Sequence, residues 1–280
     1  MNSVQIVTDS SCDLPEDLVA QLGISIVPLK IRFGQTEFVD RLELTTDQFW
    51  EKCGQTNELP STAAPAPGAF IAEFQRAAEE GASGVVAIVL SGELSATIEA
   101  AQQAAREVEG NIDVRVVDSR TVTLGLGAVV VAAAQAAKGG ANIDEVSNIA
   151  TDSAARTHVY AALDTLENLR KGGRIGAAQS LLGSMLSIKP LIEVRNGVVE
   201  PAGKQRTRTK ALGYLLKVVE EHAQQIESIY VMHAQCDDVD SFVQQIKSLV
   251  QIEVLVGQIG PVVGAHAGIG TIGVVFQTTS

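Results

Sequence analysis

The stretch of residues 85–105 constrains the fold of this chain more than any other segment. It opens with six consecutive apolar residues, 85–90, most of them β-branched. Such a run predicts a strand that is buried on both faces. Ser91 and Gly92 end the run, and Ser95 then precedes an alanine-rich segment of good helix formers. Ser95 is therefore a candidate N-cap.

A buried strand, a polar turn and a helix form the repeating unit of α/β proteins, which bind ligands at the carboxyl ends of their strands. The turn would place the hydroxyls of Ser91 and Ser95, together with free backbone N–H groups, at that edge of the sheet. Two serines that simply cap a turn would give the same pattern. Two further stretches, residues 60–65 and 260–268, favour a ligand site over a plain turn.

The composition agrees with an α/β fold. Of the 280 residues, 46% are hydrophobic but only 4% are aromatic, so the core consists of Val, Ile, Leu and Ala side chains. A chain of this length can form one large domain or two ordinary ones. The formal charge of −12 argues against nucleic acid as a general partner, because binding to phosphates requires a basic surface.

The sequence shows no pattern typical of a membrane span, a secretory signal or a metal site. No apolar run reaches the roughly 18 residues needed to span a bilayer. The first residues, MNSVQIVTDSS, lack the basic and long apolar segments of a secretory signal. Cys12, Cys53 and Cys236 are scattered without CxxC spacing, so neither a disulfide framework nor a zinc site is expected. We therefore expect a cytoplasmic protein without a metal ion or other cofactor.

Strands and helices alternate in the first half of the chain, which predicts βαβ units and a mostly parallel sheet. Residues 56–67 include three prolines and are expected to form a loop without a helix. Residues 125–138 are nearly all apolar, which is typical of a helix buried on most sides. The expected strands cover residues 4–8, 24–33, 85–90 and 112–117, and further expected helices begin at Pro15, Thr45 or Thr46, Gly68 and Asn142.

The second half predicts an α+β arrangement with a mixed or antiparallel sheet. Asn196-Gly197 is the strongest hairpin signal in the chain. We place the boundary near residue 156, which gives an N-terminal α/β domain of residues 1–156 and a C-terminal α+β domain of residues 157–280. The expected strands cover residues 158–163, 188–194, 198–203, 228–233, 251–257 and 270–276, and the expected helices cover residues 164–171, 176–183, 207–221 and 237–250.

Common nucleotide and hydrolase motifs do not fit this chain. Residues 268–273 spell G-x-G-x-x-G, but a strand-like segment follows where a dinucleotide site requires a helix. The sequence contains no P-loop, no G-x-S-x-G and no H-E-x-x-H motif. His266 lies among several glycines, where a backbone can approach a ligand closely. The pattern supports a functional histidine and a structural one equally.

Positive charge is concentrated in one stretch. Residues 170–210 carry nine Lys or Arg side chains against two Glu, a net +7, so the rest of the chain carries −19. A solvated face is the usual explanation of a charged run. Segregation this strong favours a docking surface for an acidic partner or a phosphate.

Several segments together resemble the DegV family. They are the opening Val4-Gln5-Ile6-Val7-Thr8-Asp9-Ser10, then Leu163-Asp164-Thr165-Leu166 with Lys171-Gly172-Gly173-Arg174-Ile175, then Arg206-Thr207-Arg208 with Lys210-Ala211, and residues 260–270 around His266. Their order over the whole chain carries the resemblance. It implies two α/β domains with an acyl tunnel between them.

The resemblance also implies the residues of a site. The family's two carboxyl-binding hydroxyls match Thr62 and Ser95, and its histidine matches His266. The loop and the turn that carry the hydroxyls depart from the family pattern, with Ala63 and Ala64 in place of Ser-Gln and Ala96 in place of Gly. These changes put the headgroup fit and the acyl preference in question. The family's partner-docking arginines match Arg174 and Arg206 or Arg208.

On this resemblance the chain binds a long-chain fatty acid and presents its carboxylate to the catalytic subunit of a bacterial fatty acid kinase, which forms an acyl phosphate for phospholipid metabolism. The chain itself would not be an enzyme, and a transient contact with a membrane or an acyltransferase would fit the same role. One alternative is an autonomous phosphotransferase or esterase that uses Ser95 and His266. Another is a general lipid buffer without a kinase partner.

Overall fold

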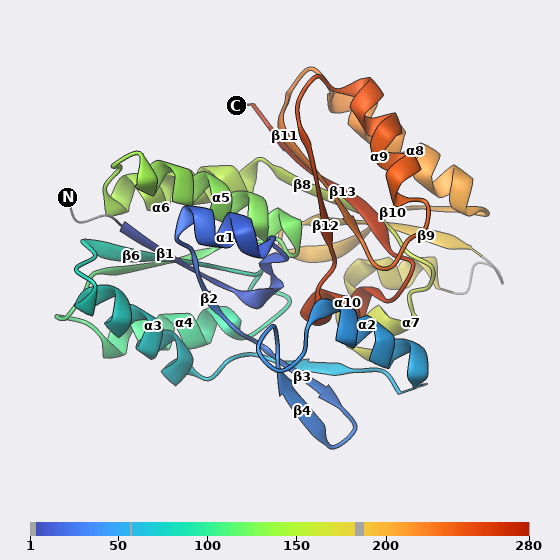
Figure 1. Cartoon of the computed structure of the whole chain (residues 1–280). Helices are drawn as coiled ribbons and strands as arrows, with labels where there is room; N and C mark the ends of the chain where they lie inside the picture. Colours follow the sequence, from blue (N-terminus) through green and yellow to red (C-terminus); the bar gives the residue numbers. More distant parts are fainter. Residues whose placement is uncertain (1–3, 57, 183–187, 280) are drawn as a thin grey trace.

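Two sheets, each covered by helices, form the framework of the protein (Figure 1). The structure is a computed structural model, and it describes residues 4–56, 58–182 and 188–279. The loop expected over residues 56–67 and the helix expected over residues 176–183 each include one residue outside these ranges, Asn57 and Gly183.

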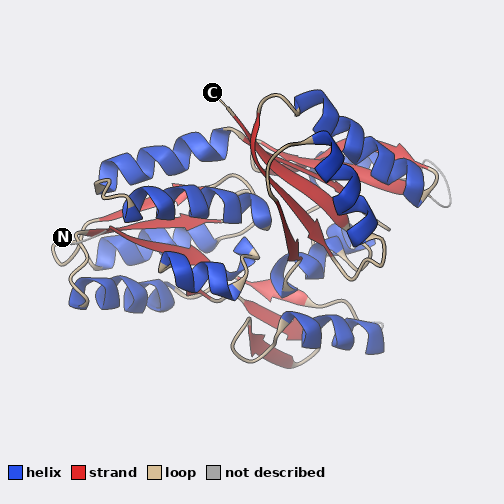
Figure 2. Cartoon of the chain, turned by 45° about the horizontal axis from the view of Figure 1, so that its top comes forward, coloured by secondary structure: helices blue, strands red, loops and turns tan. Residues whose placement is uncertain are grey.

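The first sheet is parallel throughout, with the strand order β2-β1-β6-β7. All six residues of β6 are buried, as the apolar run predicted. Helices cover both faces of this sheet, as Figure 2 shows. Its strands are β1 (Val4–Asp9), β2 (Ser25–Val27), β6 (Gly84–Val89) and β7 (Val114–Asp118). Helices α3 (Pro67–Glu79) and α4 (Thr97–Glu107) cover one face, and α5 (Leu124–Lys138) and α6 (Ile143–Ala155) the other, with α1 (Glu16–Leu22) beside α5.

A small antiparallel sheet, in the order β4-β3-β5, extends from the first sheet. The single strand expected over residues 24–33 is wrong, because Pro28 and Leu29 separate β2 from β3 and the two strands join different sheets. Proline cannot donate a backbone hydrogen bond to a ladder, so a strand tends to end there. The elements here are β3 (Lys30–Phe33), β4 (Thr36–Val39), β5 (Ser61–Ala63) and α2 (Thr46–Gln55), and the short 3₁₀ helix η1 (Ser10–Cys12) follows β1.

The second large sheet is mixed, with the order β10-β9-β8-β13-β11-β12 and β11–β12 as its parallel pair. Asn196 and Gly197 both have positive φ, 53° and 86°, as a tight hairpin requires. The predicted fold class is therefore confirmed. The strands are β8 (Thr157–Ala162), β9 (Lys189–Arg195), β10 (Val198–Gln205), β11 (Ile226–His233), β12 (Val254–Gln258) and β13 (Ile272–Thr278). The helices are α7 (Glu167–Lys171), the 3₁₀ helix η2 (Gly176–Leu181), α8 (Arg208–His222), α9 (Val239–Leu249) and α10 (Pro261–Ala267).

Helix α5 lies between the two large sheets, because it contacts β1 and β6 on one side and β8, β11 and β13 on the other. Eleven of its 15 residues are buried, which explains why its sequence is apolar on nearly every face. A Cβ atom at Gly125 would lie 2.7 Å from Val159 on β8, so glycine is required for this close approach. One continuous hydrophobic core consequently joins the two halves of the chain.

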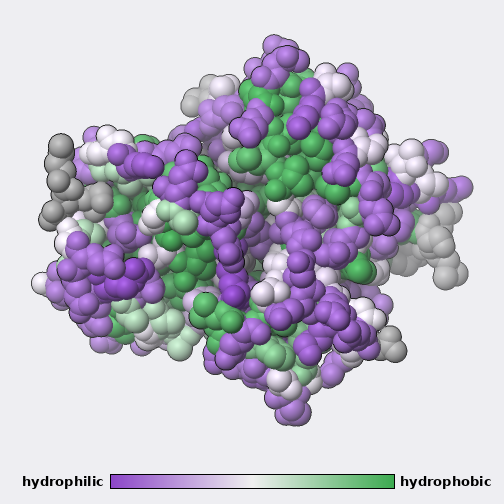
Figure 3. Space-filling model, in the orientation of Figure 1, coloured by the Kyte–Doolittle hydropathy of each residue, from purple (hydrophilic) through white to green (hydrophobic). Residues whose placement is uncertain are grey.

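The surface seen in Figure 3 is largely hydrophilic, with a hydrophobic patch over the region of β12. This edge strand exposes Leu255 and Val256, which are 39% and 43% accessible. Within the described ranges, no helix combines the length and the apolar character that a membrane span requires.

Candidate functional site

A largely apolar cavity of about 180 Å³ lies between the two halves of the chain. Its walls come from the first half, from the second sheet and its hairpin, and from α10. Thr62, Ser95 and His266 all line it, although they lie far apart in the sequence. The apolar lining residues are Leu29, Ala64, Leu90, Leu94, Ala96, Val122, Val159, Ala161, Leu163, Leu169, Ile192, Val194, Val199, Met232, Ile259, Val262, Val263 and Ala267.

Thr62 and His266 form a direct hydrogen bond in the cavity wall. Thr62 lies on β5, where it pairs with Ile31 of β3, rather than in the expected loop. His266 lies in the last turn of α10, a helix that the glycine-rich sequence of residues 260–270 did not predict. The Thr62 Oγ1 and His266 Nε2 atoms are 2.9 Å apart. Two segments separated by some 200 residues thus meet at one point.

His266 is neutral at physiological pH. Burial, and then the nearby positive charge of Arg174, lowers its pKa to about 4. Its Nδ1 atom is buried and has no hydrogen-bond partner among the described residues. A Cβ atom at Gly172 would lie 2.3 Å from Nδ1, so the imidazole packs directly on the Gly172 backbone. The ring is therefore a neutral hydrogen-bonding group on the cavity wall and supplies no full counter-charge to an anion.

Ser95 lies in the turn between β6 and α4, as predicted, but it is not the N-cap. That position belongs to Ala96, which has no side chain to cap the helix. The Ser95 hydroxyl lies 2.9 Å from Thr97 Oγ1 and accepts a hydrogen bond from the backbone N–H of Thr97 at 3.3 Å. One hydroxyl of the cavity wall is thereby held by its own turn.

Arg174 also lines the cavity. Its Nε donates to the carbonyl of Leu94 at 3.1 Å, and its Nη1 donates to the carbonyl of Gly172 at 2.7 Å. The guanidinium therefore joins the turn before Ser95 to the turn beside His266. The charge pattern predicted Arg174 on a docking surface and gave no sign that its side chain also lines the cavity.

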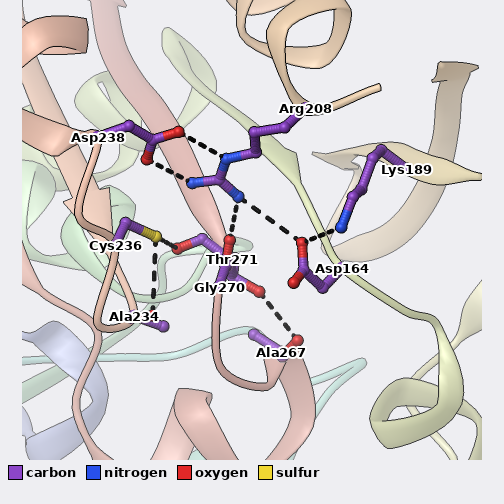
Figure 4. A network of polar contacts seen from close by, with 9 residues as sticks. All are labelled: Asp164, Lys189, Arg208, Ala234, Cys236, Asp238, Ala267, Gly270 and Thr271. Atoms are coloured by element: carbon purple, nitrogen blue, oxygen red, sulfur yellow. Dashed lines mark hydrogen bonds and ion pairs between the residues drawn. The ribbon is translucent and has the colours of Figure 1, made fainter. Parts of the chain in front are cut away.

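Arg208 is part of a network of polar contacts in the second half of the chain (Figure 4). Its guanidinium forms two hydrogen bonds with Asp238, at 2.9 and 2.8 Å, and also donates to the carbonyl of Gly270. Asp164 lies 3.8 Å away and pairs with Lys189 at 2.6 Å. Arg206, by contrast, is exposed, and its side chain forms no hydrogen bond or ion pair with another described residue.

The arrangement suits the binding of an apolar molecule with a polar end. Hydroxyls and a neutral imidazole gather on the wall of an otherwise apolar cavity, with one cation beside them. Ser95 bonds to Thr97 and His266 bonds to Thr62, so the two do not form the serine–histidine pair of an esterase. Among the residues that the structure describes, no group of three metal-ligating side chains is present.

The fold and this cavity define a class, namely two-sheet α/β proteins that enclose an apolar cavity with a polar end. The chain belongs to the DegV family, since a family model described as "Uncharacterised protein, DegV family" matches residues 3–279. A DegV domain-containing protein from Streptomyces coelicolor is 38% identical over 279 residues, 98% of each chain.

Solved structures agree with this assignment. The structure described as fatty acid binding of a DegV family protein from Thermus thermophilus has a TM-score of 0.91 and 32% identity, over 99% of this chain and 100% of that one. DegV from Bacillus subtilis, described as a fatty acid binding protein, has a TM-score of 0.90 and 28% identity, over the full length of both chains. The predicted family is thus confirmed.

Two residues beside the cavity were not identified from the sequence. Thr123 lines the cavity, and Asp13 accepts a hydrogen bond from it at 2.6 Å. The available signal was the position of Asp13 in the polar turn after the first strand, at the carboxyl edge where parallel sheets bind ligands.

Proposed function

We propose that this protein binds a long-chain fatty acid, with its carboxylate at Thr62, Ser95 and His266 and its tail in the apolar cavity. The observation that carries the proposal is the presence of these three side chains on the wall of one cavity. Solved relatives that share the fold are described as fatty acid binding proteins, which supports the same ligand class.

The energetics of such a ligand divide between its two ends. Each buried methylene contributes roughly 0.8 kcal/mol, so the tail supplies most of the affinity. The headgroup contributes orientation through hydrogen bonds that are each worth about 1 kcal/mol. Neutral donors hold a carboxylate less firmly than a bidentate arginine would. The carboxylate then stays available as a nucleophile.

We further propose that the protein is a carrier, without enzymatic activity of its own, that presents this carboxylate to the catalytic subunit of a fatty acid kinase in the cytoplasm. Arg174, Arg206 and Arg208 are the docking candidates that the family resemblance supplies. Arg206 suits contact with an acidic partner best, because it is exposed and unpaired among the described residues. Arg174 and Arg208 would stabilise the docking surface rather than contact the partner directly, since their guanidinium groups already form hydrogen bonds within the chain.

Mass spectrometry of the purified protein tests the ligand class. We expect a retained fatty acid, released on denaturation, and binding of added palmitate to the delipidated protein. A retained nucleotide, or no binding of palmitate, would contradict the proposal. An ester hydrolysis assay addresses the autonomous enzyme, and turnover that depends on Ser95 would favour that alternative.

The docking proposal is tested with Arg206→Glu. The variant should bind fatty acid normally but couple poorly to the kinase subunit, with salt-sensitive association, because rim charges act mainly on encounter. Arg106→Glu is the matched control. Arg106 is an exposed arginine on α4, so its substitution changes the charge by the same amount outside the basic stretch. Equal effects of both variants on coupling would reject Arg206 as a docking residue.

A further inference from the structure

Asp13 occupies an unusual position between the two halves of the chain. It ends the turn after β1, is 7% exposed, and has the left-handed backbone angles φ 51° and ψ 22°. Its Oδ2 atom accepts a hydrogen bond from the Thr123 hydroxyl at 2.6 Å. Asp13 forms no ion pair with any residue that the structure describes, and burying a carboxyl group without one is costly.

Thr123 is the residue at the other end of that bond. It precedes α5, lines the acyl cavity, and has φ 53° and ψ −140°. Such angles are a strained conformation for a β-branched residue and cost about 1–3 kcal/mol. Strain of this kind persists only where the surroundings hold it. The hydrogen bond to Asp13 is one contact that holds this part of the cavity wall.

The second carboxylate oxygen of Asp13 faces the start of α10. Burial raises the pKa of Asp13, and the hydrogen bonds from the Thr123 hydroxyl and from the backbone N–H of Gly260 lower it by less. A Cβ atom at Gly260 would lie 2.5 Å from Oδ1, so this approach requires glycine. Gly260 is the N-cap of α10 and has no side chain to cap it, and the last turn of the same helix carries His266. Asp13 therefore contacts both the cavity wall and the helix that holds the imidazole.

We propose that Asp13 is a positioning residue of the fatty-acid site, which fixes Thr123 and the start of α10 and thereby sets the place of His266 against the headgroup. Asp13 does not line the cavity itself, so it acts through these two residues. The proposal rests on the proposed function. Trp50 supports the same helix start, because its Nε1 donates to the carbonyl of Ile259 at 3.0 Å.

The test compares Asp13→Gly with Asp13→Asn in the full-length, delipidated protein. Glycine adopts the left-handed backbone without strain, so Asp13→Gly removes the carboxylate alone. Asparagine also tolerates that backbone, and its amide can still accept from Gly260 and bond to Thr123. Gln235→Gly is the matched control, because Gln235 is exposed and has a φ of 54°.

We measure the dissociation constants of palmitate and of hexadecanol, which has the same length and no carboxylate. Asp13→Gly should weaken palmitate binding by about tenfold, the size of one or two hydrogen bonds, and hexadecanol binding by less than twofold. Asp13→Asn and Gln235→Gly should bind both ligands as the parent does. The His266 imidazole resonances should shift in Asp13→Gly and stay in place in Asp13→Asn.

Normal palmitate binding by Asp13→Gly, or an equal loss for both ligands, would overturn the proposal. Failure of the parent protein to bind palmitate would instead overturn the proposed function, so the two outcomes are distinct. If Asp13→Gly does not fold, Thr123→Val and Thr123→Ser replace it. Both side chains fit the site, but only serine keeps the donor, so a loss in Thr123→Val with rescue in Thr123→Ser supports the proposal. Equal palmitate binding by the two would refute it.

Discussion

Two polar clusters in this protein are built in opposite ways. In the network around Arg208, cations meet carboxylates of the same chain, as in the pairs Arg208–Asp238 and Lys189–Asp164. The cluster of Thr62, Ser95 and His266 contains no charged side chain, and one of its atoms, His266 Nδ1, is buried without a partner in the described chain. The first cluster pairs its charges within the chain, whereas the second places neutral hydroxyls and a neutral imidazole on the wall of a cavity.

The contrast separates residues that stabilise the fold from residues that we expect to bind the ligand. The Arg208 guanidinium uses three of its five N–H donors within the chain, two on a carboxylate and one on a carbonyl, so its substitution should change stability. The Thr62–His266 and Ser95–Thr97 bonds join neutral groups and are each worth only about 1 kcal/mol, so substitutions there should change stability little and affinity more.

Arg208→Ala should have the largest effect on folding. It leaves Asp238 without its partner and frees the Gly270 carbonyl. Because Arg208 and Asp238 are partly exposed, we expect a loss of about 2–3 kcal/mol in the free energy of unfolding, measured by chemical denaturation. Arg208→Lys should recover part of this loss, since lysine keeps the positive charge but cannot form the two parallel hydrogen bonds of a guanidinium. A stable Arg208→Ala variant that has lost fatty acid binding would reverse the assignment.

Asp13 and Asp238 should respond to pH in opposite directions. Burial raises the pKa of Asp13 to about 7, whereas hydrogen bonds from Arg208 lower the pKa of Asp238. Protonated Asp13 therefore adds to the free energy of unfolding in full below the usual pKa of 3.8, and this stabilisation is lost as the pH rises through about 7. Ionised Asp238 adds to the free energy of unfolding above pH 3.8, and this stabilisation is lost as the pH falls through its lowered pKa.

Asp13→Asn isolates the first of these effects. The stability of the parent relative to this variant should fall by about 1.4 kcal/mol per pH unit between pH 5 and 7, then level off. Denaturation curves of both proteins at pH 5, 6, 7 and 8 give the difference directly. A constant difference across this range would mean that Asp13 keeps an ordinary pKa.

Thr62→Val should act on the ligand and not on the fold. It removes the hydroxyl that bonds to His266 while keeping the shape of the side chain. We expect palmitate affinity to fall by about five- to tenfold and the free energy of unfolding without ligand to change by less than about 1 kcal/mol. Calorimetric titration and denaturation of the same preparation measure the two effects. A large loss of stability with unchanged affinity would place Thr62 among the structural residues.

Lys171→Ala should have the smallest effect. Lys171 pairs with Glu167 one helical turn away on an exposed face, at 2.6 Å. Solvent screens a pair this exposed almost completely, so stability and affinity should both stay within error of the parent. A change as large as that of Arg208→Ala would show that ion pairs of the surface and of the network are equivalent.

Local patterns predicted the elements that depend on local chemistry. The apolar run became the fully buried β6, and Asn196-Gly197 became a tight turn with two positive φ angles. Helix α10 was missed because Gly264 and Gly268 weaken any helical signal. Glycine is required at position 264 by a residue that is distant in the sequence, since a Cβ atom there would lie 2.7 Å from Trp50.

The site was harder to predict because its contacts join distant segments. Thr62 and His266 are 204 residues apart, and Thr123 and Asp13 are 110 apart. No periodicity or spacing reports such a pairing. The resemblance to the family supplied Thr62, Ser95 and His266, but it gave Arg208 a surface role and did not reveal its bonds to Asp238 and Gly270.

A melting series on delipidated protein tests whether the cavity binds an acyl chain. Acids of increasing length should raise the melting temperature progressively until the cavity is full, since each buried methylene adds roughly 0.8 kcal/mol to binding. A ligand at 100 times its dissociation constant adds about 2.7 kcal/mol, which is a rise of a few degrees for a chain of this size. Alcohols of equal length should stabilise less, because the hydroxyls and His266 lose a charged acceptor. A melting temperature that does not depend on acyl length would show that the cavity does not bind the acyl chain.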